Sequence, residues 1–276
     1  MMRALYSGVS GLKNHQTRMD VIGNNIANVN TVGYKTSRVV FQDLYSQTLN
    51  SGTGSTAAVG GSNAMQVGLG ASMASIDVLH TRGGTQYTGS QLDFAIEGDG
   101  YFILDVNGSK YYTRSGNFKL DDDNNLVNSQ GYFVQGYSLD MTATPPVMGT
   151  TLGNINIDPS FKNITVDNNG AIWGIDAADT KVQVGQIRMA TFSNPSGLVK
   201  VGQSMYSEGA NSGAAVYGNP GENGGGLLSV SSLEMSNVDL AQEFSDMIVT
   251  QRGFQACSRI ITTTDQILEE LVNMKR

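Results

Sequence analysis

The chain has 276 residues, of which 39% are hydrophobic and only 15% are charged, and its formal net charge is −7. This length can bury a substantial core, either in one large domain or in two or three small ones. The acidic balance argues against a nucleic-acid partner, and the lack of an 18-residue apolar run argues against membrane insertion.

The N-terminal part of the chain has the apolar periodicity of a helix over residues 3–28. The positions that recur at alternating spacings of four and three are Leu5, Val9, Leu12, Gln16, Met19, Gly23 and Ile26. This is the narrow seam of a coiled coil. The first residues lack the apolar segment of a secretion signal, so we expect no cleaved signal peptide.

The middle of the chain changes from helical periodicity to short apolar runs separated by turn residues. Residues 36–80 are predicted to be a linker or extended segment, because 50–61 are rich in Gly, Ser, Thr and Ala. Residues 81–210 show the hairpin pattern of an all-β domain. A Gly-rich linker is predicted over 211–232.

The C-terminal part repeats the periodicity of the N-terminus. Over residues 238–273 the recurring positions are Leu240, Phe244, Met247, Gln251, Phe254, Ser258, Ile261, Asp265, Leu268 and Val272. Asn237 is the predicted N-cap. We therefore predict a mixed fold, in which long helices within residues 1–35 and 233–276 form a coiled-coil layer and the middle is all β.

The chain shows no recognisable catalytic, cofactor or metal-binding motif. His15 and His80 fall on different predicted elements, and no nucleophile elbow accompanies either. Asp121 and Asp123 begin like a calcium loop, but Leu126 stands where that loop requires glycine. The single cysteine can form no intramolecular disulfide, and no Cys/His cluster suggests zinc. We predict that the protein is not an enzyme and has no cofactor.

Aromatic side chains in the β region leave a glycan-binding surface open as an alternative. They occupy strand positions, where burial in a sheet core is the commoner use, so we predict core. These residues are Tyr101, Phe102, Tyr111, Tyr112, Tyr132 and Phe133. A second alternative, a hydrolase acting on peptidoglycan, would need a carboxylate or His/Cys constellation that the sequence does not assemble.

Two terminal motifs resemble the signatures of the bacterial flagellar rod and hook proteins. The first is DVIGNNIANVNTVGYK over residues 20–35, and the second runs from residue 236 to residue 268. Phrases at 92–102 and 112–118 are similar to the β domain of that family. The resemblance implies that the terminal helices pack as an inner layer around an axial channel, with the β domain facing outward.

The resemblance implies a structural subunit of the flagellum that forms a tubular polymer and transmits motor torque. The Gly/Ser-rich composition of 50–61 and the C-terminal run favour the hook, with the distal rod of the basal body as the alternative. The implied partners are further copies of the chain, rod proteins, the hook cap, the hook–filament junction proteins and the type III export apparatus.

The apolar seams of the two helices are the expected assembly interface, because an exposed seam needs a partner. The expected interface residues are Leu5, Val9, Leu12, Met19, Ile22, Ile26, Leu240, Phe244, Met247, Phe254, Ile261 and Leu268. The helices could instead pair with one another within one chain. Helical symmetry and the order of the termini in the monomer stay open.

Overall fold

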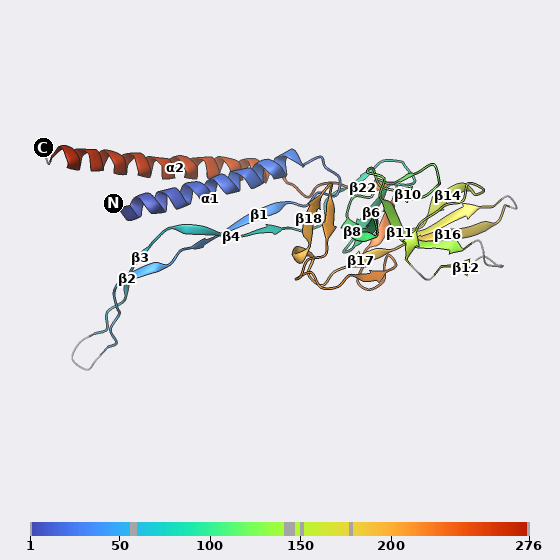
Figure 1. The fold of residues 1–276 in the computed structure, drawn as a ribbon, viewed down its shortest axis with the longest axis horizontal. Coiled ribbons are helices and arrows are strands. Elements are labelled where there is room, and N and C mark those ends of the chain that lie inside the picture. The colour runs from blue at the N-terminus through green and yellow to red at the C-terminus, as the bar shows by residue number, and fades with distance from the viewer. Residues whose placement is uncertain (1, 56–59, 141–146, 150–151, 177–178, 275–276) are drawn as a thin grey trace. The chain divides into compact units, whose positions relative to one another are not determined.

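The structure is a computed structural model that describes residues 2–55, 60–140, 147–149, 152–176 and 179–274 (Figure 1). The chain forms two compact units. The helical unit consists of Met1–Ala27, Ser37–Val78 and Asp239–Arg276, and the β unit consists of Asn28–Thr36 and Leu79–Val238. The predicted fold class, terminal helices around a largely antiparallel β middle, is confirmed.

Two long helices, α1 (Met2–Ala27) and α2 (Leu240–Asn273), lie side by side in the helical unit (Figure 1). They are antiparallel, because Asn25 of α1 meets Glu243 at the start of α2, and Gly8 lies against Ile261 farther along it. The predicted cap, Asn237, is wrong. Asp239 is the N-cap, and its carboxylate accepts hydrogen bonds from the backbone of the first turn of α2.

Glycines let the two helices approach closely. A Cβ on Gly11 would lie 2.8 Å from the Cys257 sulfur, and one on Gly253 would lie 2.7 Å from the His15 ring. Side chains larger than hydrogen at these positions would therefore displace their neighbours. The α1–α2 pairing depends on small residues as well as on apolar ones.

The segment predicted as a linker or extended region, 36–80, contains antiparallel strands. Strand β1 (Ser37–Asp43) pairs with β4 (Ala71–Val78), and β2 (Ser46–Asn50) pairs with β3 (Met65–Gly68). All residues of β2 and β3 are exposed. Residues 56–59, at the centre of the Gly/Ser-rich stretch, lie outside the described residues. A two-stranded ribbon of this kind has little stability of its own in water.

The β unit is built from short, mainly antiparallel strands. They are β5 (Thr85–Tyr87), β6 (Phe94–Glu97), β7 (Tyr101–Val106), β8 (Ser109–Thr113), β9 (Lys119–Leu120), β10 (Leu126–Val127), β11 (Phe133–Asp140), β12 (Val147–Met148), β13 (Gly153–Asn154), β14 (Lys162–Val166), β15 (Ala171–Ile175), β16 (Lys181–Ile187), β17 (Met189–Thr191), β18 (Val199–Gly202), β19 (Met205–Ser207), β20 (Val216–Gly218), β21 (Leu227–Val230) and β22 (Ser232–Glu234), with a 3-10 turn at Pro195–Gly197. The main sheet follows the order β14-β15-β16-β11-β7-β8-β19-β18.

Aromatic and aliphatic side chains fill the centre of the β unit. Phe102 and Leu104 of β7 have no exposed surface, and the rings of Phe102 and Phe118 meet edge to face at 5.1 Å between centroids. Tyr101 and Tyr112 are also buried. The prediction that these aromatic positions form sheet core is therefore confirmed for Tyr101, Phe102 and Tyr112, whose faces are unavailable to a glycan.

The β unit extends beyond the bounds 81–210 expected from the sequence. Strand β21 pairs with β6, and β22 pairs with β5, so the chain returns to the start of the unit after residue 226. Residues 28–36, which follow α1, also belong to this unit. The β unit thus includes a segment before the predicted domain, 28–36, and two strands after it, β21 and β22.

Candidate functional site

The expected interface residues fall into three groups by exposure. Ile22 is buried. Val9, Leu240 and Phe244 are exposed, at 40%, 39% and 49%. The half-buried group is Leu5, Leu12, Met19, Ile26, Met247, Phe254, Ile261 and Leu268. A half-buried row along each of two paired helices is the arrangement expected where the helices face one another and leave part of the seam uncovered.

Further large apolar side chains of α2 are exposed outside the predicted seam. They are Ile248, Val249, Ile260, Ile267 and Leu271. The heptad pattern missed them because they lie off its four-and-three spacing. The signal that could have found them is the near-absence of charge in 247–250 and 260–264, since a solvated helix face normally carries charged residues.

A buried amide joins three elements of the helical unit. The Asn25 side chain is 1% exposed; its nitrogen donates to the Ser37 carbonyl (2.9 Å) and to Glu243 Oε1 (3.0 Å), and its oxygen accepts from the Ser37 backbone nitrogen (3.1 Å). This Asn25 junction fixes the end of α1 to the start of β1 and to the first turn of α2. Burial raises the pKa of Glu243, against the opposing hydrogen bond from Asn25.

His15 packs within the helical unit. Its ring lies beside Gly253 and meets Phe41 edge to face at 6.4 Å. Burial, and then the neighbouring Arg18, lower the pKa of His15. A neutral imidazole in this position contributes packing between the elements of the helical unit.

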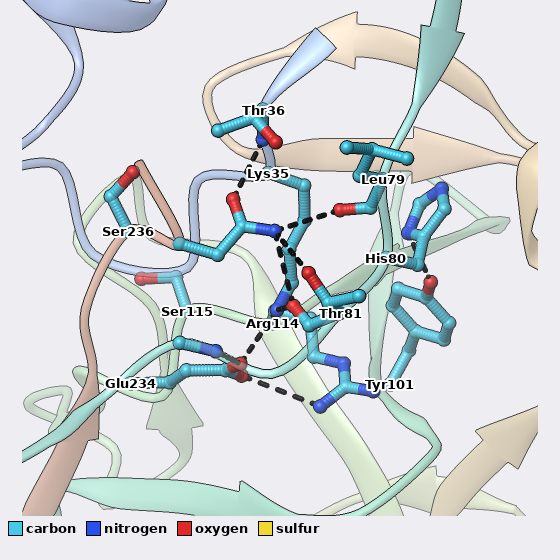
Figure 2. Close-up of polar contacts among 12 residues, drawn as sticks. Lys35, Thr36, Leu79, His80, Thr81, Tyr101, Arg114, Ser115, Glu234 and Ser236 are labelled. Carbon is cyan, nitrogen blue, oxygen red and sulfur yellow. Dashed lines mark hydrogen bonds and ion pairs between the residues drawn. The ribbon is translucent and has the colours of Figure 1, made fainter. Parts of the chain in front are cut away.

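The β unit contains a buried ion cluster, the Glu234 cluster, formed by Lys35, Arg114 and Glu234 (Figure 2). Lys35 Nζ lies 2.6 Å from Glu234 Oε1, and Arg114 Nη1 lies 3.3 Å from Glu234 Oε2. The side chains of Lys35 and Glu234 are 0% exposed and that of Arg114 is 2% exposed. Among the described residues, no other charged side chain is buried.

Glu234 also holds backbone from other segments. Its Oε1 accepts from the Gly83 nitrogen (3.0 Å), and its own carbonyl accepts from the Gly33 nitrogen (2.8 Å). Gly33 has φ +69, and a Cβ there would lie 2.7 Å from the Ser115 nitrogen. Only glycine fits this close approach without strain, which explains the glycine in the terminal motif.

Asn237 adds a second bridge beside the ion cluster. Its oxygen accepts from the Thr36 nitrogen (2.8 Å), and its nitrogen donates to the carbonyls of Leu79 (2.9 Å) and Thr81 (3.2 Å). The Leu79 nitrogen in turn donates to the Thr36 carbonyl (2.8 Å). The residue predicted as a helix cap therefore joins two chain segments instead.

Burial, together with nearby positive charges, keeps His80 neutral. Burial lowers the pKa of His80 to about 4, and the charges of Lys35, Arg114 and Lys200 add to this effect. His80 Nδ1 lies 2.6 Å from the Tyr101 hydroxyl (Figure 2). Burial also lowers the pKa of the Lys35 ammonium, which Glu234 opposes. His80 is thus a packed, neutral side chain next to positive charge.

Lys35 and Arg114 both pair with Glu234, so the cluster has the character of a structural connection. Within the described residues, no group of three or more His, Cys, Asp or Glu side chains could hold a metal ion. Neither α1 nor α2 is apolar enough over sufficient length to cross a lipid bilayer.

Sequence reasoning missed the cluster, because its members stand far apart in the chain. The only available signal was Lys35, a charged residue directly after the uncharged stretch 21–34.

Comparison with known proteins identifies the family along most of the chain. The flagella basal body rod protein model matches residues 5–35, the flagellar hook protein FlgE/F/G D1 domain matches 95–174, and the flagellar basal body rod FlgEFG protein C-terminal model matches 230–274. The flagellar basal-body rod protein FlgG of Bacillus subtilis is 50% identical over 277 residues, with all of both chains covered. The chain belongs to the flagellar basal-body rod and hook family.

Other relatives agree with this assignment. FlgG of Caulobacter vibrioides is 37% identical over 273 residues, covering 97% of each chain. The flagellar hook protein FlgE of Borreliella burgdorferi is 31% identical over 441 residues, covering all of both chains. The protein is accordingly a structural component of the flagellum, in the basal-body rod, and not an enzyme.

The expectation that the chain is a hook subunit is wrong. The match to the rod protein of Bacillus subtilis spans 277 positions end to end, whereas the match to the Borreliella hook protein spans 441 positions for a chain of 276 residues. Hook relatives therefore hold long segments that this chain lacks. The Gly/Ser content of 50–61 reports on the local pliability of one segment and does not distinguish rod from hook.

Proposed function

We propose that the chain is a distal-rod subunit of the flagellar basal body, which assembles with further copies into a tubular shaft that carries torque. Its partners are copies of itself and other axial flagellar proteins, and the type III export apparatus delivers it. The hook cap and the hook–filament junction proteins were expected with a hook subunit and are not part of this proposal.

The observation that carries the proposal is the poor burial of apolar side chains in the helical unit. Among its described residues, Ile22 is the only fully buried hydrophobic side chain. Most of the large apolar side chains that are exposed in the protein belong to this unit. Each Å² of apolar surface removed from water contributes roughly 25 cal/mol. Neighbouring subunits that cover these side chains would supply the stabilisation that the unit lacks alone.

The two groups of seam residues take different roles in this proposal. The exposed group, Val9, Leu240 and Phe244, contacts neighbouring subunits together with the exposed apolar residues of α2. The half-buried group, exemplified by Ile261 against Gly8, holds α1 and α2 together within one chain. Contacts that repeat head to tail without closing on themselves generate an open helical polymer.

Substitutions in the two groups test this division. Phe244→Asp should raise the critical concentration for polymerisation by at least about tenfold, because a carboxylate would have to be desolvated at an apolar contact. The monomer should keep its helical circular dichroism, since the Phe244 side chain is exposed in the single chain. Phe244→Leu, which preserves apolar surface, is the control and should polymerise.

Ile261→Asp is the matched variant for the half-buried group. It should lower the helical signal of the monomer as well as polymerisation, because Ile261 packs on α1 within the chain. Sedimentation velocity measures assembly and circular dichroism measures helicity. Polymers of wild-type critical concentration from Phe244→Asp would show that this residue does not face a neighbour.

A further inference from the structure

We propose that Glu234 is a positioning residue that holds three chain segments of the β unit together, namely 33–36, 79–83 and 234–237. The three segments then open only as one cooperative unit, and we call this arrangement the lock. The single carboxylate, rather than either cation, controls this lock, because the cluster contains two buried positive charges and one negative charge. No part of this proposal depends on the rod assignment.

The geometry supports a lock because hydrogen bonds from Glu234 and Asn237, both in the third segment, reach the other two segments. Glu234 bonds to Lys35 and Gly83 through one carboxylate oxygen and to Arg114 through the other (Figure 2). Asn237 bonds to Thr36 and to the 79–81 segment. If one segment leaves, the others lose hydrogen bonds, and the buried ion pairs of the Glu234 cluster lose their shared partner, so the segments should open together.

The three segments are where the chain enters and leaves the β unit. The unit begins with residues 28–36, resumes at residue 79, and ends at residue 238. Along the chain, α1 precedes the first segment, β1 follows it, β4 precedes the second, and α2 follows the third. A force applied along the chain from either terminal helix therefore reaches the β unit through these residues.

The unequal charge count predicts unequal effects of removing each partner. Without Lys35, Arg114 and Glu234 remain as a neutral pair, and the Thr81 carbonyl still accepts from Asn237. Without the Glu234 carboxylate, two positive charges remain buried with no buried counter-charge among the described residues. Leaving buried cations without a carboxylate costs far more than removing one of two cations that share a carboxylate.

Hydrogen exchange of the full chain tests the lock at four backbone amides. The nitrogens of Gly33, Thr36, Leu79 and Gly83 donate to hydrogen bonds that join the three segments. In the wild type we expect their protection factors to agree within about threefold, as for one opening unit. In Glu234→Gln all four should fall by at least about a hundredfold.

Matched variants separate the charge effect from general destabilisation. Lys35→Met should reduce the same four protection factors by about tenfold or less. Glu97→Gln breaks the exposed Arg82–Glu97 pair (3.1 Å) and should change them less than about fivefold. The Gly170 amide, which bonds within its own turn to Asp167, is the internal reference and should exchange alike in all variants.

The double variant Lys35→Met/Glu234→Gln covers the case in which Glu234→Gln does not fold. Removing one of the two unpaired cations should recover protection, or folding itself, relative to Glu234→Gln alone. The proposal is overturned if the double variant is no more stable than the single one, or if Lys35→Met and Glu234→Gln have equal effects. It is also overturned if the four amides respond independently to Glu234→Gln.

Discussion

In the β unit, side chains such as Phe94, Phe102 and Leu104 have no exposed surface, whereas the described part of the helical unit fully buries one hydrophobic side chain, Ile22. The two units also differ in the polar side chains that join their segments. The helical unit is joined by the neutral amide of Asn25, and the β unit by the three charges of the Glu234 cluster. One unit contains its own core, and the other presents the surface of a core that assembly would complete.

Exchange in the isolated monomer should show the largest difference between the units. Amides in β7 and β11 should be protected at least about a thousandfold more than amides in α1 and α2, because the sheet opens only with global unfolding. Hydrogen exchange with mass spectrometry measures both regions in one experiment. Strong protection along both helices in the monomer would contradict the comparison, and assembly should raise helix protection alone.

Acid should weaken the β unit through His80. The pKa of His80 is lowered by burial, and then by nearby cations, from an ordinary value of 6.5 to about 4. Between these values the unfolded chain binds a proton that the folded unit does not, so stability falls as pH decreases from about 6.5 to 4. The loss should approach about 3 kcal/mol from this group.

Urea denaturation at pH 7.5 and at pH 4.5 would measure this loss. Trp173 is the only tryptophan in the sequence and lies on β15, so its fluorescence reports on the β unit. His80→Gln removes the titrating group and should reduce the difference between the two pH values. An unchanged difference in this variant would assign the acid sensitivity to carboxylates instead.

Gly253→Ala should loosen the helix pair by a smaller amount. The added methyl group would lie 2.7 Å from the His15 ring, so the ring or the helix must move at a cost of about 1–3 kcal/mol. Cys257, which lies beside Gly11 at the neighbouring contact between α1 and α2, provides the readout. Its reaction rate with a thiol reagent should rise as the pair opens.

Gly23→Ala is the matched control and should have the smallest effect, with the opposite sign. No atom lies within 4 Å of a Cβ at this position. Alanine should stabilise α1 by about 0.5–1 kcal/mol through its better helix propensity. A slower Cys257 reaction in Gly23→Ala, with a faster one in Gly253→Ala, would establish that close approach, rather than helix propensity, limits the pairing.

The sequence predicted those parts of the fold that are encoded locally. The heptad spacing located α1 and α2 to within two residues at each end, and turn residues between short apolar runs identified the β middle. Strands β2 and β3 were not recognised as a pair, because they are short and all their residues are exposed, so no buried face marks them in the sequence.

The buried site could not be predicted, because its members meet only in the folded chain. Asn237 was assigned to the nearest helix end, a local role, although its partners are Thr36, Leu79 and Thr81. Glu234 lies shortly before α2, and nothing in its neighbouring sequence distinguishes it from an exposed charged residue. Local propensity contains no information about which distant charges share one interior.

The distance along the chain between the charges of the Glu234 cluster sets an order in time. Glu234 follows Lys35 by 199 residues and Arg114 by 120. A ribosome that adds about 5–20 residues per second needs roughly 10–40 s to proceed from Lys35 to Glu234. Until Glu234 has been synthesised, Lys35 and Arg114 have no carboxylate with which to form the buried ion pairs. The three segments of a nascent chain therefore stay unlocked until nearly all of the β unit has been synthesised.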